Sequence, residues 1–549
     1  MSFISTRSIA RVAVGLVFTA TATVPLMTAA SADTNTDPSP AKSVTVFLKA
    51  PNPHGLAALA RNHTLSHNER IAAVKQLLPT AAQHEQAAKA LRAQGFTVTD
   101  ESSWSVTASA PATTVAAVFG ARPKLAAHAT VAQRAAATGA LPDLPASLSS
   151  VASAAFPTTG GPAAFGHIKV GGRAHRPANS RGKPGDALTN SPENYGYDFQ
   201  DAYEAPSLTK AGGAPASGRY RSQRLTIATL QFTGWNPGDL SDYADAAGLP
   251  YSSSTITQVP VDQASIPPAD DTGADLEVDL DQESILSTDP YAHQRAYFAP
   301  NNDAGFDDAF SQVVDDVTGV DAYNGGDAHI GALSVSWGSC EAQNDAGAID
   351  AAEPIIESLV AAGVTVFASS GDSGAYDCTS YDVDGNPVDA TVGVDYPASS
   401  PVVIGVGGTN LSSQTAAFNN GSNWSETAWS CTTVTDCFTD PDATGGSGGG
   451  VSDTFPEPSY QSSTLSTTQN DRGGRLVPDI AVEGDPATGF IIDTTDPTLL
   501  PYGQYWQVGG TSLASPVSAA LFTAMLSDHG RTTGIGDIHS NLYNAPSSA

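Results

Sequence analysis

The sequence predicts an α/β fold in which a mostly parallel sheet carries helices on both faces, preceded by a small α+β unit with an antiparallel sheet. Three observations predict it. The chain has 549 residues, which exceeds the usual size of one hydrophobic core. From residue 225 onward, short runs rich in Val and Ile alternate with stretches of helical apolar spacing. Residues 43–126 instead mix alternating strand patterns with helices, as a separate unit would.

The small N-terminal unit is predicted from the order of its segments. One strand pattern comes first, two helical patterns follow, and then come two short strands and a final helix. This order predicts an antiparallel sheet backed by helices, as in ferredoxin-like folds. The segments are SVTVFLKA (43–50), HNERIAAVKQLL (67–78), AAQHEQAAKALRAQG (81–95), FTVTDESSWSVTASA (96–110) and ATTVAAVFG (112–120).

The next stretch, residues 127–190, is rich in Ala, Gly and Pro and ends in GGRAHRPANSRGKPGDALTN. Such a composition predicts a low-complexity basic linker that is accessible to proteolytic cutting. A domain, an exposed linker and a larger domain together have the layout of a zymogen. We therefore expect an activation prodomain at 33–175, a processing linker at 176–192 and a catalytic domain at 193–549.

The larger domain shows continuous hydrophobic strand patterns separated by helical stretches, which predicts parallel strands buried on both faces. In such sheets the active site lies at the carboxyl ends of the strands. The expected strands are LTIATLQF (225–232), STITQVPV (254–261), HIGALSVSW (329–337), GVTVFASSG (363–371) and PVVIGVGG (401–408). The expected helices are DLSDYADAAG (239–248), GADLEVDLDQESIL (273–286) and DAGAIDAAEPIIESLVAAG (345–363).

The extreme N-terminus has the pattern of a secretory signal peptide at 1–32. Arg7 and Arg11 precede an apolar run at 12–26, and Ala30-Ser31-Ala32 supplies small residues before a cleavage point. A membrane anchor is disfavoured because the run is short and interrupted, and no later segment approaches about 18 apolar residues. We expect a secreted, extracellular protein with no membrane contact after the signal is removed.

Four cysteines fit an oxidising compartment: Cys340, Cys378, Cys431 and Cys437. Three pairings are possible from sequence alone, and we favour Cys340 with Cys378 and Cys431 with Cys437. A zinc site is not expected, because the sequence has no CxxC pair and no His/Cys cluster.

Charge is distributed unevenly along the chain, whose net charge is −31. Residues 33–190 hold 15 Lys and Arg against 8 Asp and Glu, whereas residues 191–549 hold 8 against 48. One interpretation is that acidity simply keeps the protein soluble. Another is that the basic segment docks on the acidic one at neutral pH and loosens when carboxylates protonate. Nucleic acid is a poor partner for so acidic a surface.

The candidate nucleophile is Ser512 in VGGTSLASP (508–516), directly before a stretch of helical apolar spacing. A helix N-terminus offers free N–H groups that stabilise an oxyanion. Ser512 or Thr511 could equally be only a helix N-cap. GTSxASP resembles the nucleophile segment of subtilisin-like peptidases, which also require an Asp and a His-Gly-Thr-His motif upstream. The acidic half has no such histidine motif, so we expect a base other than histidine.

Carboxylates are the available bases. Glu277 and Asp281 lie four residues apart, so on a helix both would project from one face and share a proton. A carboxylate base suits an enzyme that works in acid. Asp372 ends the strand pattern GVTVFASSGDSG, and its protonated carboxyl could donate to an oxyanion. Alternatively, Glu277 and Asp281 form a solvated acidic helix face, and Asp372 is a turn residue.

Together, EVDLDQESI, SSGDSG and GGTSLASP resemble the sedolisins, or serine-carboxyl peptidases, which have a subtilisin-like fold. Residues 396–409, 448–461 and 477–490 are also similar to family segments, and 43–175 resembles the family's activation prodomain. The resemblance implies that Ser512 is the nucleophile, Glu277 its base, Asp281 the acid bonded to that base, and Asp372 the oxyanion donor. It also implies endopeptidase activity at acid pH on protein or peptide substrates, with the prodomain acting as intramolecular inhibitor and chaperone.

The family also implies calcium, bound near the C-terminus through an Asp-Ile or Asp-Val pair and a later Gly-x-Gly-x-Asp loop. Asp537-Ile538 is similar to the pair, but its neighbourhood better resembles the segment before the site. We expect the calcium ligands to lie beyond Ala549, and the catalytic domain of this chain to be C-terminally incomplete.

Two other functions remain open from the sequence. DTG at 271–273 and DSG at 372–374 look like the paired signatures of a pepsin-type aspartic peptidase, with Asp271 and Asp372 as the catalytic pair. This alternative leaves the Ser512 motif unexplained, and no apolar strand precedes Asp271. The chain could also be a catalytically dead secreted binding protein.

Overall fold

The computed structural model describes residues 41–120, 144–159, 164–174, 202–203, 225–262, 265–269, 273–344, 347–381, 387–413, 424–430, 445–465 and 470–545. The expected signal peptide (1–32) and processing linker (176–192) lie outside these residues, as do Asp271, Cys431 and Cys437. Within the described ranges, no helix combines the length and the apolar character needed to cross a membrane.

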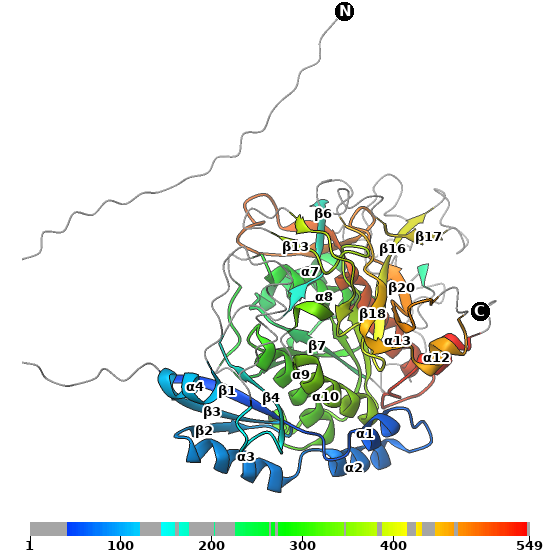
Figure 1. The fold of residues 1–549 in the computed structure, drawn as a ribbon. Coiled ribbons are helices and arrows are strands. Elements are labelled where there is room, and N and C mark those ends of the chain that lie inside the picture. The colour runs from blue at the N-terminus through cyan, green and yellow to red at the C-terminus, as the bar shows by residue number, and fades with distance from the viewer. Residues whose placement is uncertain are drawn as a thin grey trace, which may run out of the picture. The chain divides into compact units, whose positions relative to one another are not determined.

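The N-terminal unit has the predicted antiparallel sheet, in the order β2-β3-β1-β4 expected of a ferredoxin-like fold (Figure 1). Capping boxes fix the starts of α2 and α3, since Ser66 and Thr80 each exchange hydrogen bonds with the residue three positions later. The strands are β1 (Ala41–Leu48), β2 (Thr97–Glu101), β3 (Ser105–Pro111) and β4 (Ala152–Pro157); the helices are α1 (Pro53–Ala60), α2 (His67–Leu77), α3 (Ala81–Ala93) and α4 (Ala112–Phe119).

The low-complexity prediction for residues 127–190 is wrong for part of that stretch. β4 completes the N-terminal sheet, and β5 (Phe165–Gly166) and β6 (Lys169–Arg173) pair with strands of the larger domain. Ala- and Gly-rich composition hid these strands, because their pairing partners lie more than a hundred residues away along the chain.

The larger domain is built on an eight-stranded sheet in which all neighbours are parallel except one edge pair, β16 with β17. Its main order is β17-β16-β12-β10-β7-β9-β8, with β20 beside β16. The strands are β7 (Thr226–Gln231), β8 (Ile256–Pro260), β9 (His293–Phe298), β10 (Ile330–Val335), β12 (Thr365–Ser369), β16 (Ile404–Ser413), β17 (Trp424–Ala428) and β20 (Ile480–Glu483). The sequence patterns did not indicate β9.

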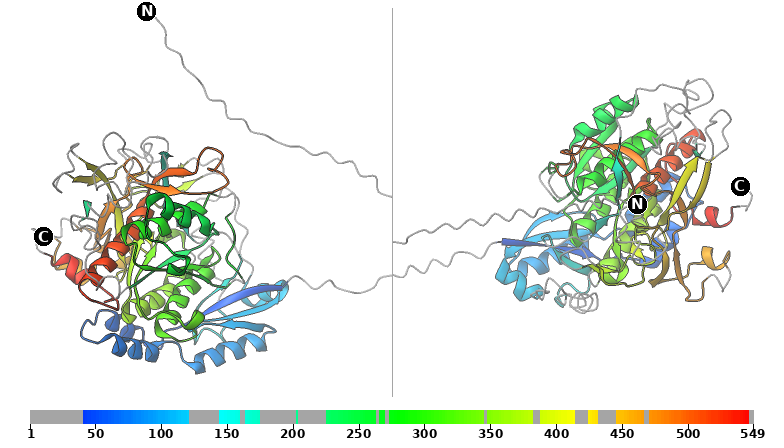
Figure 2. Two further views of the ribbon diagram at one scale, coloured as in Figure 1. Left: turned by 180° about the vertical axis from the view of Figure 1, so that it is seen from behind. Right: turned by 90° about the horizontal axis from the view of Figure 1, so that it is seen from above.

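Helices cover both faces of this sheet, as predicted. Successive residues of a strand point to opposite faces, and they contact different helices. Ile227 and Phe367 pack with α8 (Asp275–Thr288) and α13 (Thr511–Asp528), while their neighbours Ala228 and Val366 pack with α9 (Asp303–Thr318) and α10 (Ala348–Ala362). Figure 2 shows the red α13 from two further directions. Further helices of the domain are α7 (Pro237–Ala247), α12 (Ser459–Ser462) and α14 (His539–Tyr543). The α/β fold class is therefore confirmed.

The N-terminal unit contacts α9 through polar groups of residues 102–105. Ser105 Oγ donates to Asp308 at 2.8 Å, and the backbone N–H of Ser103 donates to Asp315 at 3.2 Å. The buried Trp104 lies between them and shares one hydrophobic core with α9 and α10. At this contact serine and backbone groups, rather than Lys or Arg, meet the acidic residues.

Candidate active site

Ser512 lies in the first turn of α13 and is fully buried. The residue before that helix, Gly510, has φ of 106°, where glycine is favoured, and a Cβ there would overlap the carbonyl oxygen of His167. The helix starts without a side-chain cap, so the N-cap interpretation of Ser512 and Thr511 is wrong. Instead Ser512 N–H donates to the His167 carbonyl at 3.0 Å, and Ser512 Oγ donates to the Ser336 carbonyl at 3.2 Å.

Glu277 and Asp281 lie one turn apart on α8, which packs against α13. Every residue of α8 is buried, Glu277 at 1% exposure and Asp281 at 0%. The solvated-face interpretation of this pair is therefore wrong. Burial raises the pKa of Glu277 well above its usual value, and the nearby Asp281 raises it further, while the adjacent Ser512 hydroxyl lowers it in part.

Asp281 accepts a hydrogen bond on each carboxylate oxygen. Ser336 Oγ donates to Oδ1 at 2.6 Å, and Gln231 Nε2 donates to Oδ2 at 2.6 Å. Gln231 is itself oriented by Trp337, whose Nε1–H donates to its Oε1 at 3.2 Å. Burial raises the pKa of Asp281 to about 7, although these two donors lower it. Because Asp281 is held as an acceptor on both sides, a proton shared by the pair is better placed on Glu277.

Asp372 follows β12 and is anchored to the start of α13. Its Oδ1 accepts hydrogen bonds from the Thr511 backbone N–H at 2.7 Å and from Thr511 Oγ1 at 2.9 Å. Its Oδ2 is buried, has no hydrogen-bond partner among the described residues, and lies beside Gly510 near the His167 carbonyl. Burial raises the pKa of Asp372, against the lowering influence of Lys169, His167 and Thr511. Asp372 is thus more than a turn residue.

The structure therefore brings together all four residues singled out from the sequence, and it adds others that the sequence patterns did not reveal. Gln231 ends β7 and Ser336 directly follows β10, and neither position gave a signal that the residue holds Asp281. His167 was missed because its segment has a linker-like composition. Asp395 directly precedes the family-like tract that begins at Tyr396, and that position was the only signal for it in the sequence.

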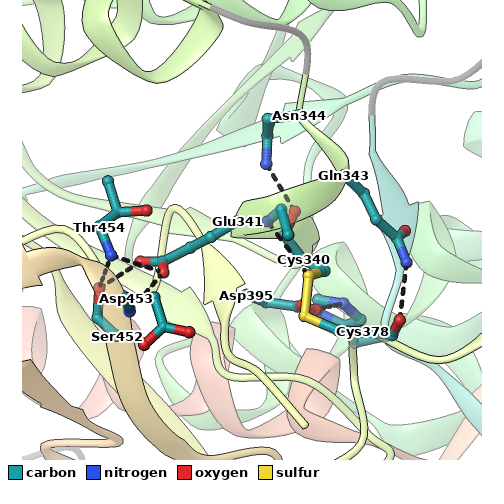
Figure 3. Close-up of a disulfide and its surroundings, with 11 residues drawn as sticks. Cys340, Glu341, Gln343, Asn344, Cys378, Asp395, Ser452, Asp453 and Thr454 are labelled. Carbon is teal, nitrogen blue, oxygen red and sulfur yellow. Dashed lines mark hydrogen bonds and ion pairs between the residues drawn. A yellow bond between two sulfur atoms is a disulfide. The ribbon is translucent and has the colours of Figure 1, made fainter. Parts of the chain in front are cut away.

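A disulfide joins Cys340 to Cys378 next to this site, which confirms one predicted pairing. Cys340 ends β11 (Trp337–Cys340), which pairs with β15 (Asp395–Tyr396), and Cys378 lies in the loop after β12. Figure 3 shows Asp395 beside the disulfide, and Gln343 Nε2 donates to the Cys378 carbonyl at 3.2 Å. The bridge thereby ties together two walls of a cavity beside Ser512.

The residues described here do not form a calcium site. Asp537 Oδ1 accepts a hydrogen bond from the backbone N–H of His539 at 3.0 Å and makes a 2.6 Å contact with its Nδ1. Across the described ranges, no three His, Cys, Asp or Glu side chains are grouped to hold a metal ion. Calcium remains an expectation from the family alone.

Comparison with known proteins agrees with the fold and the motifs. The model of the subtilase family matches residues 303–534. Kumamolisin of Bacillus sp. (strain MN-32) is 31% identical over 409 residues, covering 73% of this chain and 64% of the relative. Sedolisin of Pseudomonas sp. (strain 101) is 31% identical over 357 residues, covering 63% and 53%. The chain thus spans less than two thirds of the length of these curated relatives.

Among solved structures, Pseudomonas sedolisin, a serine-carboxyl proteinase complexed with two molecules of pseudo-iodotyrostatin, is similar with a TM-score of 0.51 and 28% identity. The alignment covers 65% of this chain and 86% of that one. The likeness includes the parallel sheet and its helices, and relatives and sequence motifs point to the same family. In sequence and fold the chain is similar to the sedolisins, a family of serine-carboxyl peptidases.

Proposed function

We propose that this chain is a secreted, acid-acting serine-type endopeptidase made as a zymogen. Ser512 is the nucleophile, Glu277 the base that takes its proton, Asp281 the partner of that base, and Asp372 the oxyanion donor. The observation that carries the proposal is the buried carboxylate pair on α8, packed against α13, whose first turn contains Ser512.

The first step is proton transfer from Ser512 Oγ to the Glu277–Asp281 pair as Oγ attacks a peptide carbonyl. The pair has one negative charge to receive this proton, because two adjacent buried carboxylates do not both ionise readily. Before the transfer, the proton of the pair lies on Glu277 and the charge lies on Asp281, where Ser336 and Gln231 stabilise it. As Glu277 takes the proton of Ser512, its own proton passes to Asp281, and the pair becomes neutral. Glu277 then returns the proton to the departing amine, and water releases the acyl group by the reverse sequence.

The oxyanion that forms in this step is held by the Ser512 backbone N–H and by protonated Asp372. The Ser512 N–H already donates to a carbonyl oxygen, that of His167. Asp372 Oδ2 has no partner among the described residues and lies on the same side of Gly510, so its proton has no competing acceptor there. Two donors fixed before the reaction need no reorganisation when charge develops.

These roles predict activity confined to acid pH. Asp372 must keep its proton to donate, which sets the alkaline limb, and burial raises its pKa in the favourable direction. The Glu277–Asp281 pair must keep its last negative charge to act as base, which sets the acid limb. Histidine would be protonated in this range and useless as a base.

The zymogen proposal rests on the N-terminal unit and the segment after it. The unit docks on α9 and α10, and residues 164–174 run through the site beside Ser512. A segment in this position excludes other substrates. Secretion rests on the signal-peptide pattern at 1–32 and on the disulfide.

The test is acidification of the purified full chain, followed by mass spectrometry and a peptide-hydrolysis assay. We expect self-processing and activity in the wild type, and loss of both, by about 10³-fold or more, in Ser512→Ala and Glu277→Gln. Two variants are the matched controls. Ser518→Ala removes a buried hydroxyl from the same helix, and Glu283→Gln alters a buried carboxyl on α8.

Processing by purified Ser512→Ala would contradict the proposal. Inhibition of that variant by pepstatin would favour the aspartic peptidase with Asp271 and Asp372. Folded wild-type protein that neither processes nor cleaves peptides would favour a binding protein. Inhibition of wild-type processing and peptide hydrolysis by pseudo-iodotyrostatin, the compound bound in the Pseudomonas sedolisin structure, would support the Ser512 site.

A further inference from the structure

Residues 164–174 cross the site in the manner of a bound substrate. On one side, β5 pairs antiparallel with β11, with Gly166 opposite Trp337. On the other side, β6 pairs antiparallel with β22 (Tyr505–Gly509), the strand that leads into the helix of Ser512. Main-chain pairing with exposed strands is a common way in which extended peptides are bound. His167 and Ile168 lie between the two paired stretches.

The His167 carbonyl occupies the position that the proposed oxyanion requires. Its oxygen accepts the Ser512 N–H hydrogen bond at 3.0 Å and lies on the same side of Gly510 as Asp372 Oδ2. One residue earlier, Gly166 lies so close to Glu277 that an added Cβ would overlap a carboxylate oxygen. The peptide bond after His167 is therefore the one presented to the nucleophile.

The His167 side chain is buried in a pocket and paired with a carboxylate. Its Nε2 lies 2.8 Å from Asp395 Oδ2, and its Nδ1 lies 2.7 Å from Ser369 Oγ. Burial alone would lower the pKa of His167, but Asp395 and, more weakly, Asp372 outweigh burial and Lys169, so the pKa is raised. These surroundings thus favour the protonated, cationic form of the ring.

The walls of this pocket also contain buried side-chain oxygens that are not hydrogen-bonded to His167. The cavity has a volume of about 480 Å³, and its walls include Asp377, Thr379 and Asp395. Asp395 Oδ1, Asp377 Oδ2 and Thr379 Oγ1 are buried without a hydrogen-bond partner among the described residues. A hydrogen-bond donor would stabilise such buried, unpaired oxygens, and a guanidinium or ammonium group provides several donors at once. The Cys340–Cys378 bridge fixes the walls of this cavity (Figure 3).

We infer that this pocket selects a cationic residue on the acyl side of the cleaved bond through Asp395, and that the first processing cut falls between His167 and Ile168. The inference rests on the proposed function. Ser512 Oγ forms an ester with the His167 carbonyl carbon, the C–N bond to Ile168 breaks, and Ile168 leaves as an amine with a proton from Glu277. One water molecule then hydrolyses the ester and leaves a carboxyl group on His167.

The first experiment maps the cut. The full chain is acidified, quenched at early times, and its new N-terminus is identified by mass spectrometry. We expect Ile168 as the first new N-terminus in the wild type and in His167→Arg. We expect His167→Leu to slow this cut by about tenfold or more, since Asp395 is left buried without its cation. His329→Leu, which changes an exposed histidine, is the matched control and should cut as the wild type does.

The second experiment measures selectivity with the acidified full-chain preparation. The peptides are Ala-Phe-Gly-X-Ile-Lys-Val, the sequence of residues 164–170 with Arg, Lys, Leu or Glu at X in place of His167. We expect kcat/KM for Arg and Lys to exceed that for Leu by about tenfold or more, and Glu to be the poorest. Asp395→Asn should raise KM for Arg and Lys and leave Leu nearly unchanged.

The outcomes separate this inference from the proposed function. Processing by Ser512→Ala would overturn both. A wild type that processes itself through Ser512, but cuts first elsewhere or prefers Leu at X, would overturn the inference alone. An Asp395→Asn variant that weakens all four peptides equally would assign Asp395 a merely structural role and would likewise overturn it.

Discussion

Two groups of buried carboxyls in the larger domain differ in one respect, the presence of a cation. Around Ser512, Glu277 and Asp281 are buried together, and the groups that contact Asp281 are the neutral donors Ser336 and Gln231. At the opposite extreme, Asp479 is equally buried but forms an ion pair with Arg475, at 2.6 Å. The pKa directions follow this difference.

Arg475 is fully buried and uses all of its guanidinium nitrogens. It donates to Asp479 and to the backbone carbonyls of Ser400, Ala398 and Val403, which lie around the start of β16. Although burial would raise the pKa of Asp479, Arg475 and His539 hold it below its usual range. A carboxyl with a lowered pKa stays ionised as the pH falls, so the pair persists in acid.

The contrast shows how one residue type serves two purposes. With a cation beside it, a buried carboxylate has a fixed charge and acts as a structural tie between segments. Without one, burial and neighbouring carboxyls raise its pKa, so it can keep a proton or share one with a neighbour. The second condition is what general acid–base chemistry needs, and strongly raised pKa values mark it.

The largest expected effect comes from removing the cation of the structural group. Arg475→Leu should lower the stability of the full chain by about 3–5 kcal/mol, because the buried Asp479 loses its closest cation and keeps only His539, at 3.5 Å. Thermal unfolding in a Ser512→Ala background, which prevents self-digestion, measures it. The double variant Arg475→Leu with Asp479→Leu should recover much of the loss. Equal instability of the single and double variants would show that the backbone hydrogen bonds of Arg475, rather than charge compensation, dominate.

The next effect concerns Asp372, the proposed oxyanion donor, whose pKa is raised by burial although Lys169 and His167 lower it. Asp372→Ala should lower kcat by about 10²–10³-fold, since one oxyanion donor is lost. Asp372→Asn should lose much less, because an amide can accept from Thr511 with its oxygen and donate with its nitrogen. Since the amide cannot deprotonate, its alkaline limb should move to higher pH than in the wild type.

The pH profile of kcat/KM for one peptide substrate checks this assignment, with Ser512→Ala as the inactive baseline. A wild-type alkaline limb retained in Asp372→Asn would show that another group sets it. Equal losses in Asp372→Ala and Asp372→Asn would contradict the donor role and leave Asp372 as an anchor for Thr511.

The sequence could predict the parts of this site that depend on local pattern. Four-residue spacing placed Glu277 and Asp281 on one helix face, and the helical apolar spacing after Ser512 placed that serine at the start of a helix. Burial of α8 on all sides could not be predicted, because its composition is that of a solvated acidic helix. Deep burial is what converts the pair from a surface feature into a proton-sharing site.

Long-range contacts account for what could not be predicted. His167 reaches the site because β5 and β6 pair with strands about 170 and 340 residues further along the chain. Asp395 is one of 48 acidic residues in the larger domain, and its only signal in the sequence is its position directly before the family-like tract at 396–409. Arg475 finds its carbonyl partners more than 70 residues away. One interpretation of the uneven charge was that the basic segment docks on the acidic one, yet the described contact with α9 uses Ser103 and Ser105.

The smallest expected effect concerns Gln231, a positioning residue that contacts Asp281 of the proposed catalytic pair. Gln231 Nε2 lowers the pKa of Asp281 by donating to Oδ2. Its removal in Gln231→Leu should raise the pKa at which the Glu277–Asp281 pair loses its last negative charge. The acid limb of kcat/KM should therefore move upward by up to about one pH unit, while the rate at the optimum falls only several-fold.

Gln231→Glu sharpens this prediction because its effect depends on protonation. In acid the new carboxyl is protonated and can donate to Asp281 as the amide did, so the acid limb should stay near that of the wild type. Near neutral pH it ionises and repels Asp281, and activity should fall there. An acid limb that shifts equally in Gln231→Leu and Gln231→Glu would show that Gln231 acts by packing against Trp337 rather than by its hydrogen bond to Asp281.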